Sequence, residues 1–198
     1  MVGIPSKIKA FGAGLVMFCV VLLSSIEKSA AQTDYVIDND HTSIIFSVSH
    51  YKIGYLYGRF NKCTGLVAID RFDPSICEFR FKVKSDSIDT NNSDRDIALR
   101  GNQFFDSNTY PTIEFFSTAV TEKDGTYFAE GQLKIKEVTK DVMLPFKLTG
   151  SGPGPLGKTR VGMLCKFVVK RSDYGITEML TNIGDDIAIT FSLQAIRK

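Results

Sequence analysis

Residues 91–117, NNSDRDIALRGNQFFDSNTYPTIEFFS, interrupt a strand pattern that runs through most of this 198-residue sequence. Before them, residues 77–85 alternate apolar and mostly charged side chains, and alternation resumes at Thr112. A period of two is typical of a strand with one buried face. A β protein that inserts one short helical connection between strands can use it to close the end of a sheet or barrel, and we expect that role here.

The interrupting stretch carries the signals of a short helix. Asn92 or Ser93 can cap its start, acidic residues follow where the helix dipole favours them, and Gly101 offers a left-handed stop. A further turn carries Phe104 and Phe105 before a Tyr-Pro pair forces extended backbone. We therefore predict a helix that ends at Gly101, followed by a turn whose two Phe side chains form part of a wall.

Outside this stretch, the sequence indicates strands joined mostly by short turns. The expected strands cover residues 35–38, 43–51, 57–70, 77–84, 112–120, 126–136, 139–149, 158–171 and 186–197. About eight strands with short connections favour an antiparallel barrel or sandwich, and closure removes edges that would template aggregation. An eight-stranded barrel is just wide enough to fill with side chains or to hold one slender ligand.

The N-terminal residues resemble a secretory signal. Lys7 and Lys9 precede an uncharged run over residues 10–25, which is shorter than the roughly 20 apolar residues that span a bilayer. Small residues then end at Ala31. We expect residues 1–31 to be cleaved, leaving one domain over residues 32–198 in the periplasm or outside the cell. The alternative is an uncleaved membrane anchor.

The formal charge of +2 belongs to this N-terminal segment. It holds Lys7, Lys9, Lys28 and Glu27, out of totals of 24 basic and 22 acidic residues, so the remaining chain is formally neutral. A neutral domain has no overall field for a nucleic acid, and we expect no nucleic-acid partner.

Three cysteines remain in the expected mature chain: Cys63, Cys77 and Cys165. An odd number leaves at least one free thiol. A hairpin turning at residues 70–75 would set Cys77 opposite about Ala68, so we expect no bridge to Cys63. Because Cys77 shares a face with apolar residues, a buried thiol is favoured over a reactive one.

The sequence gives no firm indication of catalysis or of a metal site. His41 and His50 are the only histidines, and an odd separation along one strand would place them on opposite faces. Nucleophile-elbow, zinc-protease, Walker and dinucleotide motifs are absent from the sequence. We therefore expect no catalytic residue, no metal and no cofactor.

Four motifs together resemble the YceI family of bacterial periplasmic proteins. They are TNNSDRD–LR–FFD–YP–I–F–ST over residues 90–118, Tyr35-x-Ile37-Asp38-x-x-His41-x-Ser43, Gly131-x-Leu133-x-Ile135-x-x-Val138-Thr139-Lys140, and Arg171-x-Asp173-Tyr174-Gly175. The resemblance covers the whole expected mature chain in order. One position departs from it: members often carry His two residues after the Arg-Asp pair, where this sequence has Ala98.

This resemblance implies a mainly β protein, an eight-stranded antiparallel lipocalin-like barrel with one short helical connection. It further implies a carrier that holds an amphiphilic lipid inside, such as an isoprenoid quinone, a polyprenyl phosphate, or a fatty acid or amide. A homodimer and a transient contact with a membrane are left open. Two rivals also remain: an enzyme or redox accessory that acts on an isoprenoid-like substrate through a cysteine or His50, and a structural domain with a solid core.

The candidate ligand-binding residues are mostly apolar positions on the expected inner faces of the strands. With 15 Phe and no Trp, nearly every expected strand carries a Phe, which suits either a packed core or an apolar channel. Arg95 and His50 are the polar candidates, because a guanidinium can bind an anionic head group and His50 follows Val48 on the inner face. The full set is Phe46, Val48, His50, Phe79, Phe81, Val83, Arg95, Phe104, Phe105, Phe128, Phe146, Phe167, Ile189 and Phe191.

Overall fold

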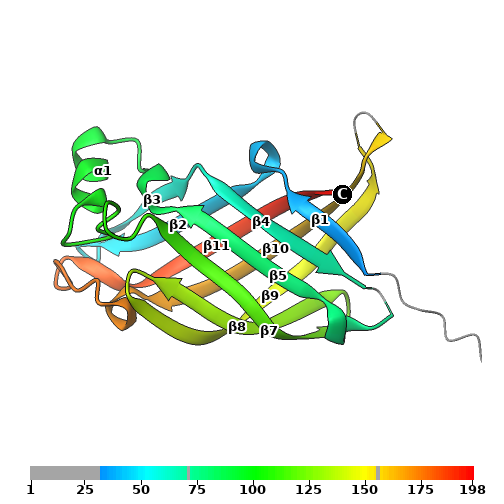
Figure 1. The fold of residues 1–198 in the computed structure, drawn as a ribbon. Coiled ribbons are helices and arrows are strands. Elements are labelled where there is room, and N and C mark those ends of the chain that lie inside the picture. Colours follow the sequence, from blue (N-terminus) through cyan, green and yellow to red (C-terminus); the bar gives the residue numbers. More distant parts are fainter. Residues whose placement is uncertain (1–31, 71, 155–156) are drawn as a thin grey trace, which may run out of the picture.

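The protein folds into a closed, elongated barrel with one helix at one end (Figure 1). The structure is a computed structural model that describes residues 32–70, 72–154 and 157–198. The expected signal segment, residues 1–31, lies outside the described residues and stays a prediction. Among the described residues, none of the helices has the length and apolar character that a membrane crossing requires.

Eleven strands and short helical turns make up the described chain. The strands are β1 (Thr33–Ile37), β2 (Ser43–His50), β3 (Gly54–Phe60), β4 (Cys63–Ile69), β5 (Glu78–Lys84), β6 (Ile88–Asp89), β7 (Thr112–Lys123), β8 (Thr126–Ile135), β9 (Val138–Pro153), β10 (Thr159–Lys170) and β11 (Ile183–Arg197). The helical elements are η1 (Asn39–His41), η2 (Pro74–Ile76), η3 (Ser85–Ser87), α1 (Ser93–Arg100) and η5 (Arg171–Tyr174).

The barrel closes through antiparallel pairs in the order β1-β4-β5-β7-β8-β9-β10-β11, with β11 returning to β1. The long strand β11 also pairs with β2, so β1 and β2 follow one another along the same side of β11. Likewise β4 pairs with β1 while β3 pairs with β2, so β3 and β4 share one position in the wall. The prediction of an eight-stranded antiparallel barrel with one helical connection is confirmed.

The inner face of each strand follows the predicted alternation, with one error of phase. In β5, Phe79, Phe81 and Val83 are buried, as expected. In β8, however, Tyr127 is buried and Phe128 faces outward, so the prediction that Phe128 points inside is wrong. Directly paired residues share a face, and Tyr127 lies opposite the buried Phe146.

The helical connection begins where predicted and ends differently. The Asn92 side chain accepts a hydrogen bond from the Arg95 amide at 2.9 Å and caps α1. Gly101 has φ −70° and ψ 170°, so the expected left-handed stop is wrong. The following turn replaces it, because its amides satisfy the last helical carbonyls: Phe105 donates to Leu99. This fold-back brings residues 101–111 over the same end of the barrel as α1 (Figure 1).

Candidate functional site

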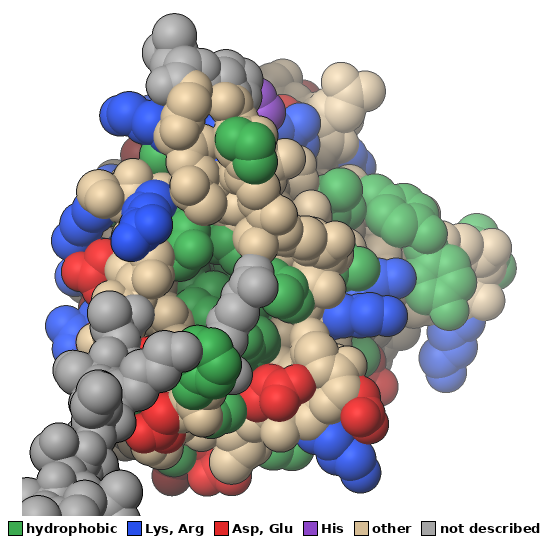
Figure 2. Space-filling model, turned by 90° about the vertical axis from the view of Figure 1, so that its right-hand side faces the viewer, with side chains coloured by type: hydrophobic (Ala, Val, Ile, Leu, Met, Phe, Trp, Pro, Cys, Tyr) green, Lys and Arg blue, Asp and Glu red, His purple; other side chains and the backbone are tan. Residues whose placement is uncertain are grey.

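In the half of the barrel away from α1, the described inward side chains are close-packed. Eight apolar side chains that are only 0% or 1% exposed make up this packed half: Val67, Phe79, Ala129, Phe146, Met163, Cys165, Leu193 and Ala195. Phe79 stacks on Phe146 with ring centroids 4.7 Å apart, and Tyr127 packs against Phe79 at 6.3 Å. Figure 2 shows this end, where hydrophobic side chains fill the middle and charged side chains surround them.

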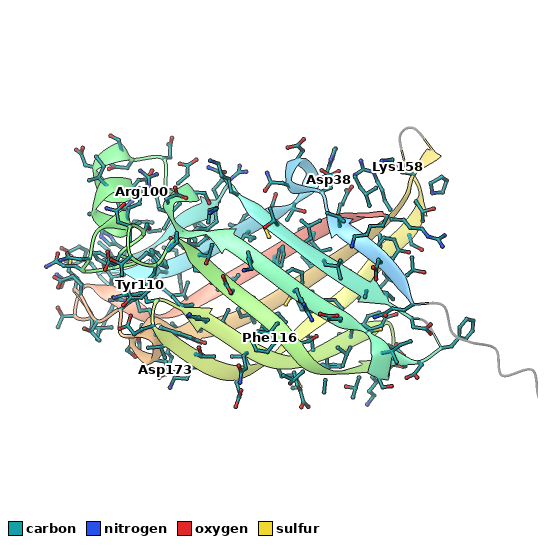
Figure 3. The ribbon with its side chains drawn as sticks, in the orientation of Figure 1. Asp38, Arg100, Tyr110, Phe116, Lys158 and Asp173 are labelled. Atoms are coloured by element: carbon teal, nitrogen blue, oxygen red, sulfur yellow. The ribbon has the colours of Figure 1, made fainter. Side chains whose placement is uncertain are left out.

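An ion pair ties the strands at this packed end together. Asp38, just after β1, pairs with Arg160 of β10 and accepts from the ring of His41 at 2.8 Å. The hydrogen bond from Arg160 holds the pKa of the Asp38 carboxyl below its usual value. Figure 3 labels Asp38 and Lys158 at this end, far from Arg100 at the helical end. The His41 side chain is 55% exposed and lies outside the interior.

The half under α1 encloses a cavity of about 380 Å³. That volume lies within the range typical of ligand sites. Its floor is aromatic: Phe81 stacks on Phe115 at 5.9 Å and meets Phe191 edge-on at 5.1 Å. Most predicted ligand-binding residues line this cavity, namely Phe46, Val48, His50, Phe81, Val83, Arg95, Phe104, Phe105, Phe167, Ile189 and Phe191.

Phe79 and Phe146 were predicted to line the site but do not. Both are fully buried behind the floor, where each packs against Phe81. Both side chains point inward, as predicted. They lie farther along the barrel axis than the floor of the cavity, so they do not line it. Phe128 also lies outside it, because it points away from the interior.

The helical connection forms the roof of the cavity. Phe105 packs edge-on against Phe60 of β3 at 5.6 Å, and Phe60 in turn packs against Phe46 of β2 at 5.8 Å, so the roof contacts the wall at β3. A Cβ at Gly58 would overlap the tip of the Phe46 ring, so any larger residue there would require that ring to move. The most exposed lining residues are Ala98 and Met179. The cavity therefore opens between α1, the end of β2 and the segment before β11.

Buried polar contacts hold the roof in place. Asp96 is 7% exposed, and its Oδ1 accepts from the amide and the hydroxyl of Thr90 at 2.9 and 2.6 Å. Arg100 donates to the carbonyls of Asp86 and Ile88, both at 2.8 Å. A buried carboxylate needs such partners, because an unpaired one is costly. These contacts explain Asp96 of the Asn-Asn-Ser-Asp-Arg-Asp motif and Arg100 at the end of α1, neither of which lines the cavity.

Arg95 is the polar group best placed to meet a ligand. Its Nε donates to the Thr90 hydroxyl at 2.7 Å and its Nη2 to the Thr90 carbonyl at 2.6 Å. A guanidinium carries five N–H donors, so these bonds fix its orientation and leave donors over. His50 also lines the cavity; its ring meets Tyr51 edge-on at 4.6 Å and makes no hydrogen bond among the described residues.

Arg171 lines the cavity but serves the loop before β11. Its guanidinium donates to the carbonyls of Ile176, Glu178, Ile183 and Gly184 at 2.7–3.0 Å. Burial lowers the pKa of this guanidinium. Because its donors are taken up by backbone carbonyls, Arg171 shapes the wall.

Tyr174 is a lining residue that sequence reasoning missed. It is 3% exposed, and its hydroxyl makes no hydrogen bond within the described chain. Burial raises its pKa to about 12, so it stays a neutral phenol at physiological pH. The loop that carries it also contributes Ile176 and Met179. No period marks a loop, whereas the missed strand residues Ile44 and Leu133 lie on inner faces that alternation could have found.

The three described cysteines are free, buried thiols. Burial raises the pKa of Cys63 and of Cys165 to about 12, and that of Cys77 is raised as well. The thiolate is the reactive form, and these shifts suppress it. Within residues 32–70, 72–154 and 157–198, no group of His, Cys, Asp and Glu could hold a metal ion.

Known proteins share both the sequence pattern and the barrel. The model of the YceI-like domain matches residues 35–195. A UPF0312 protein of Pectobacterium atrosepticum is 31% identical over 186 residues, covering 93% of this chain and 97% of that protein. One from Yersinia pestis is 33% identical over 171 residues, covering 85% of this chain and 89% of its own length.

Solved structures agree with the fold. BcnA of Burkholderia cenocepacia superposes with a TM-score of 0.71 at 20% identity, over 80% of this chain and 99% of that one. The YceI protein of Campylobacter jejuni gives 0.66 at 26%, over 76% and 90%. A polyisoprenoid binding domain from Saccharophagus degradans gives 0.63 at 16%, over 83% and 98%. With its motifs, its barrel and a family match from Tyr35 to Ala195, this chain belongs to the YceI-like family.

Proposed function

We propose that this protein is an exported carrier that binds the apolar chain of an amphiphilic lipid in the cavity under α1. The ligand class is an isoprenoid quinone, a polyprenyl phosphate, or a fatty acid or amide. The observation that carries the proposal is the contrast inside one barrel: one half is packed shut, while the other keeps a cavity of about 380 Å³ lined almost wholly by apolar side chains. A domain selected only for stability would fill such a space, because cavities are destabilising.

The proposed binding mode follows from the lining. The chain enters between α1 and Met179 and ends on the aromatic floor of Phe81 and Phe191. Each methylene moved from water into the cavity contributes about 0.8 kcal/mol, so chain length sets affinity. Arg95 and His50 lie among the apolar residues and would orient the head group. The polyisoprenoid binding domain of Saccharophagus degradans, which shares the fold, is consistent with this ligand class.

The role proposed is transport without catalysis. The rival, an enzyme or redox accessory, would use a cysteine or His50. Burial keeps the thiols of Cys63 and Cys165 protonated, which disfavours a nucleophilic or redox role for them. A carrier tolerates any substitution that packs, so changing each cysteine singly to Ala or Val should leave lipid binding intact. Loss of binding in a folded Cys variant would support the rival.

Native mass spectrometry of the protein purified from cells tests the proposal. A stoichiometric adduct, identified after solvent extraction as a lipid with a long apolar chain, is expected. The bare polypeptide mass, unchanged after incubation with quinones and polyprenyl phosphates, would refute it. The same spectra separate monomer from dimer, and the mass of the mature chain tests cleavage after residue 31. Cell fractionation tests export to the periplasm or the medium.

A pair of adjacent variants locates the site. Phe46 faces the cavity and Ile45 faces the outside of the same strand, where it is 44% exposed. Phe46→Asp places a charge among apolar groups and should abolish the adduct, since chain burial is the main source of affinity. Ile45→Asp should keep it. If both folded variants carried the same amount of lipid, the cavity would not be the binding site.

A further inference from the structure

We propose that the open end of the barrel docks on the surface of a bilayer that contains anionic phospholipid. The docking tip consists of Tyr51, Lys52 and Ile53 in the β2–β3 turn together with Met179 and Leu180 before β11. This inference rests on the proposed function, because a lipid carrier must collect its ligand from a membrane, and it names the surface that would do so.

The docking tip exposes large apolar side chains to water. Ile53 is 89% exposed, Tyr51 50%, Met179 41% and Leu180 40%. Single exposed apolar residues are ordinary, but a contiguous group marks an interaction site. The two segments are contiguous: the Tyr51 amide donates to the carbonyl of Asn182 at 2.6 Å. They also share one end of the barrel with α1 (Figures 1 and 3).

The backbone of the turn holds Ile53 outward at a conformational cost. Tyr51 and Lys52 have φ of 50° and 59°, in the left-handed region. A tight hairpin turn with these angles normally uses Asn or Gly, because other residues are strained there. Strain in a turn that presents an exposed isoleucine indicates that the presentation has a use. A turn built only for stability would use Gly and a polar residue.

The docking tip is continuous with the mouth of the cavity. Met179 belongs to the docking tip and also lines the cavity. The ring of His50, another lining residue, packs edge-on against Tyr51 at 4.6 Å. With the tip seated in the head-group layer, an apolar chain would pass from the bilayer to the cavity along apolar side chains. It would then avoid the cost of crossing water, which is about 0.8 kcal/mol per methylene.

The composition of the two segments fits an anionic bilayer. Lys52 is the only charged residue in residues 51–57 (YKIGYLY) and 179–183 (MLTNI). A lysine near an anionic surface is attracted to it, and acidic residues would be repelled. Tyr55 and Tyr57 follow the tip along β3 and are 72% and 64% exposed. Tyrosine rings are favoured at the level of the head groups, where one end is apolar and the other wet.

Vesicle flotation with the full mature protein tests the docking tip. The vesicles contain phosphatidylethanolamine and phosphatidylglycerol, and the variant is Ile53→Asp. Ile53 is almost fully exposed, so the change should leave the fold intact. We expect vesicle binding to fall about tenfold or more, because the inserted isoleucine surface is lost. Lys52→Gln should weaken binding about fivefold on these vesicles and leave binding to purely zwitterionic vesicles unchanged.

Phe72→Asp is the matched control. Phe72 is 80% exposed and follows β4, at the end of the barrel away from α1. It should bind vesicles like the wild type. Equal binding by Ile53→Asp and the wild type, or no binding by the wild type, would overturn the docking tip. So would a concentration-dependent dimer that only Ile53→Asp abolishes, since the tip would then cover a second copy.

A second readout separates this inference from the function on which it rests. Lipid content by native mass spectrometry reports on the cavity, and vesicle binding reports on the docking tip. We expect Ile53→Asp to keep its adduct when the lipid is supplied in solution and to exchange it with vesicles more slowly. If the protein carries lipid but never binds vesicles, the docking proposal is refuted and the carrier proposal stands. A protein that binds vesicles through Ile53 but carries no lipid refutes the carrier alone.

Discussion

The two halves of this barrel are built from the same strands and differ in what fills them. In the packed half, Phe79, Phe146 and Cys165 are 0% exposed. In the hollow half under α1, the corresponding inward residues Val48, Val83 and Ile135 keep 7–9% of their surface accessible. Inward alternation is common to both halves, so alternation makes the wall but does not by itself decide whether the wall encloses space.

The roof marks the second difference between the halves. At the packed end, the Asp38–Arg160 pair ties β1 to β10 directly. At the hollow end, a helical connection held by Asp96 and Arg100 spans the opening. The four predictions that follow are ordered by the size of the expected effect.

Truncating a ring of the packed half should be the most destabilising change. Phe79→Ala leaves a cavity in a close-packed region and should cost about 3–5 kcal/mol of unfolding free energy. Phe167→Ala, at the half-buried cavity wall, should cost well under that, about 1–2 kcal/mol, because its surroundings are already open. Urea denaturation of the delipidated proteins measures both. Equal costs would mean that the two halves are packed alike.

Enlarging a valine should have opposite consequences in the two halves. Val67→Phe overfills the packed half and should cost about 1–3 kcal/mol. Val48→Phe extends into the cavity and should leave stability within about 1 kcal/mol while lowering lipid affinity about tenfold. Denaturation and lipid titration check the pair. If Val48→Phe were as destabilised as Val67→Phe, the claim that there is free space beside Val48 would be wrong.

Removing the buried carboxylate should loosen the roof alone. Asp96→Ala leaves the Thr90 amide and hydroxyl without their acceptor and should cost about 1–3 kcal/mol. Amide hydrogen exchange should rise over residues 90–111 and stay unchanged in β8 and β9. Asp94→Ala, at an exposed position of the same helix, is the control and should change both far less, because it removes only an exposed charge near the helix N-terminus. Uniform faster exchange across the barrel would contradict a local role.

Alkaline pH should destabilise the barrel through two of its buried thiols. Burial raises the pKa of Cys63 and of Cys165 from 9.0 to about 12, so the folded state holds these protons more tightly than the unfolded state. Their contribution is complete below pH 9.0 and is lost as pH rises toward about 12. Each thiol should cost about 1 kcal/mol one pH unit above its unfolded pKa. In Cys63→Ala, the free energy of unfolding should fall less steeply as the pH rises above 9.0. If it falls as steeply as in the wild type, the Cys63 thiol does not cause the loss of stability.

The sequence predicted which strand residues face the interior better than it predicted where they lie along the barrel axis. Alternation placed Phe46 and Val48 on the inner face of β2, because a half-buried strand requires that pattern. Phe79 and Phe146 satisfy the same pattern but lie beyond the floor, since periodicity carries no information on position along the barrel axis. Phe128 was assigned inward because nearly every expected strand carries a Phe, but it is Tyr127 that lies opposite the buried Phe146 and points inward.

Turns and loops could be predicted least. The long strand expected over residues 57–70 is interrupted at Asn61 and Lys62, where β3 gives way to β4. Gly101 was expected to be left-handed, but the next turn satisfied the helix end. Tyr174 and Met179 reach the cavity from a segment with no period. Their positions depend on the contacts that Arg171 makes with the loop backbone, and such contacts are set by the fold as a whole.

A crystal structure of the protein as isolated from cells, with its lipid retained, is the most direct test of the central claim. The account predicts continuous density for an apolar chain that starts near Arg95 and His50 and ends on Phe81 and Phe191, with the packed half unchanged. Density for the chain elsewhere, or an empty cavity in a protein whose mass includes a bound lipid, would contradict it.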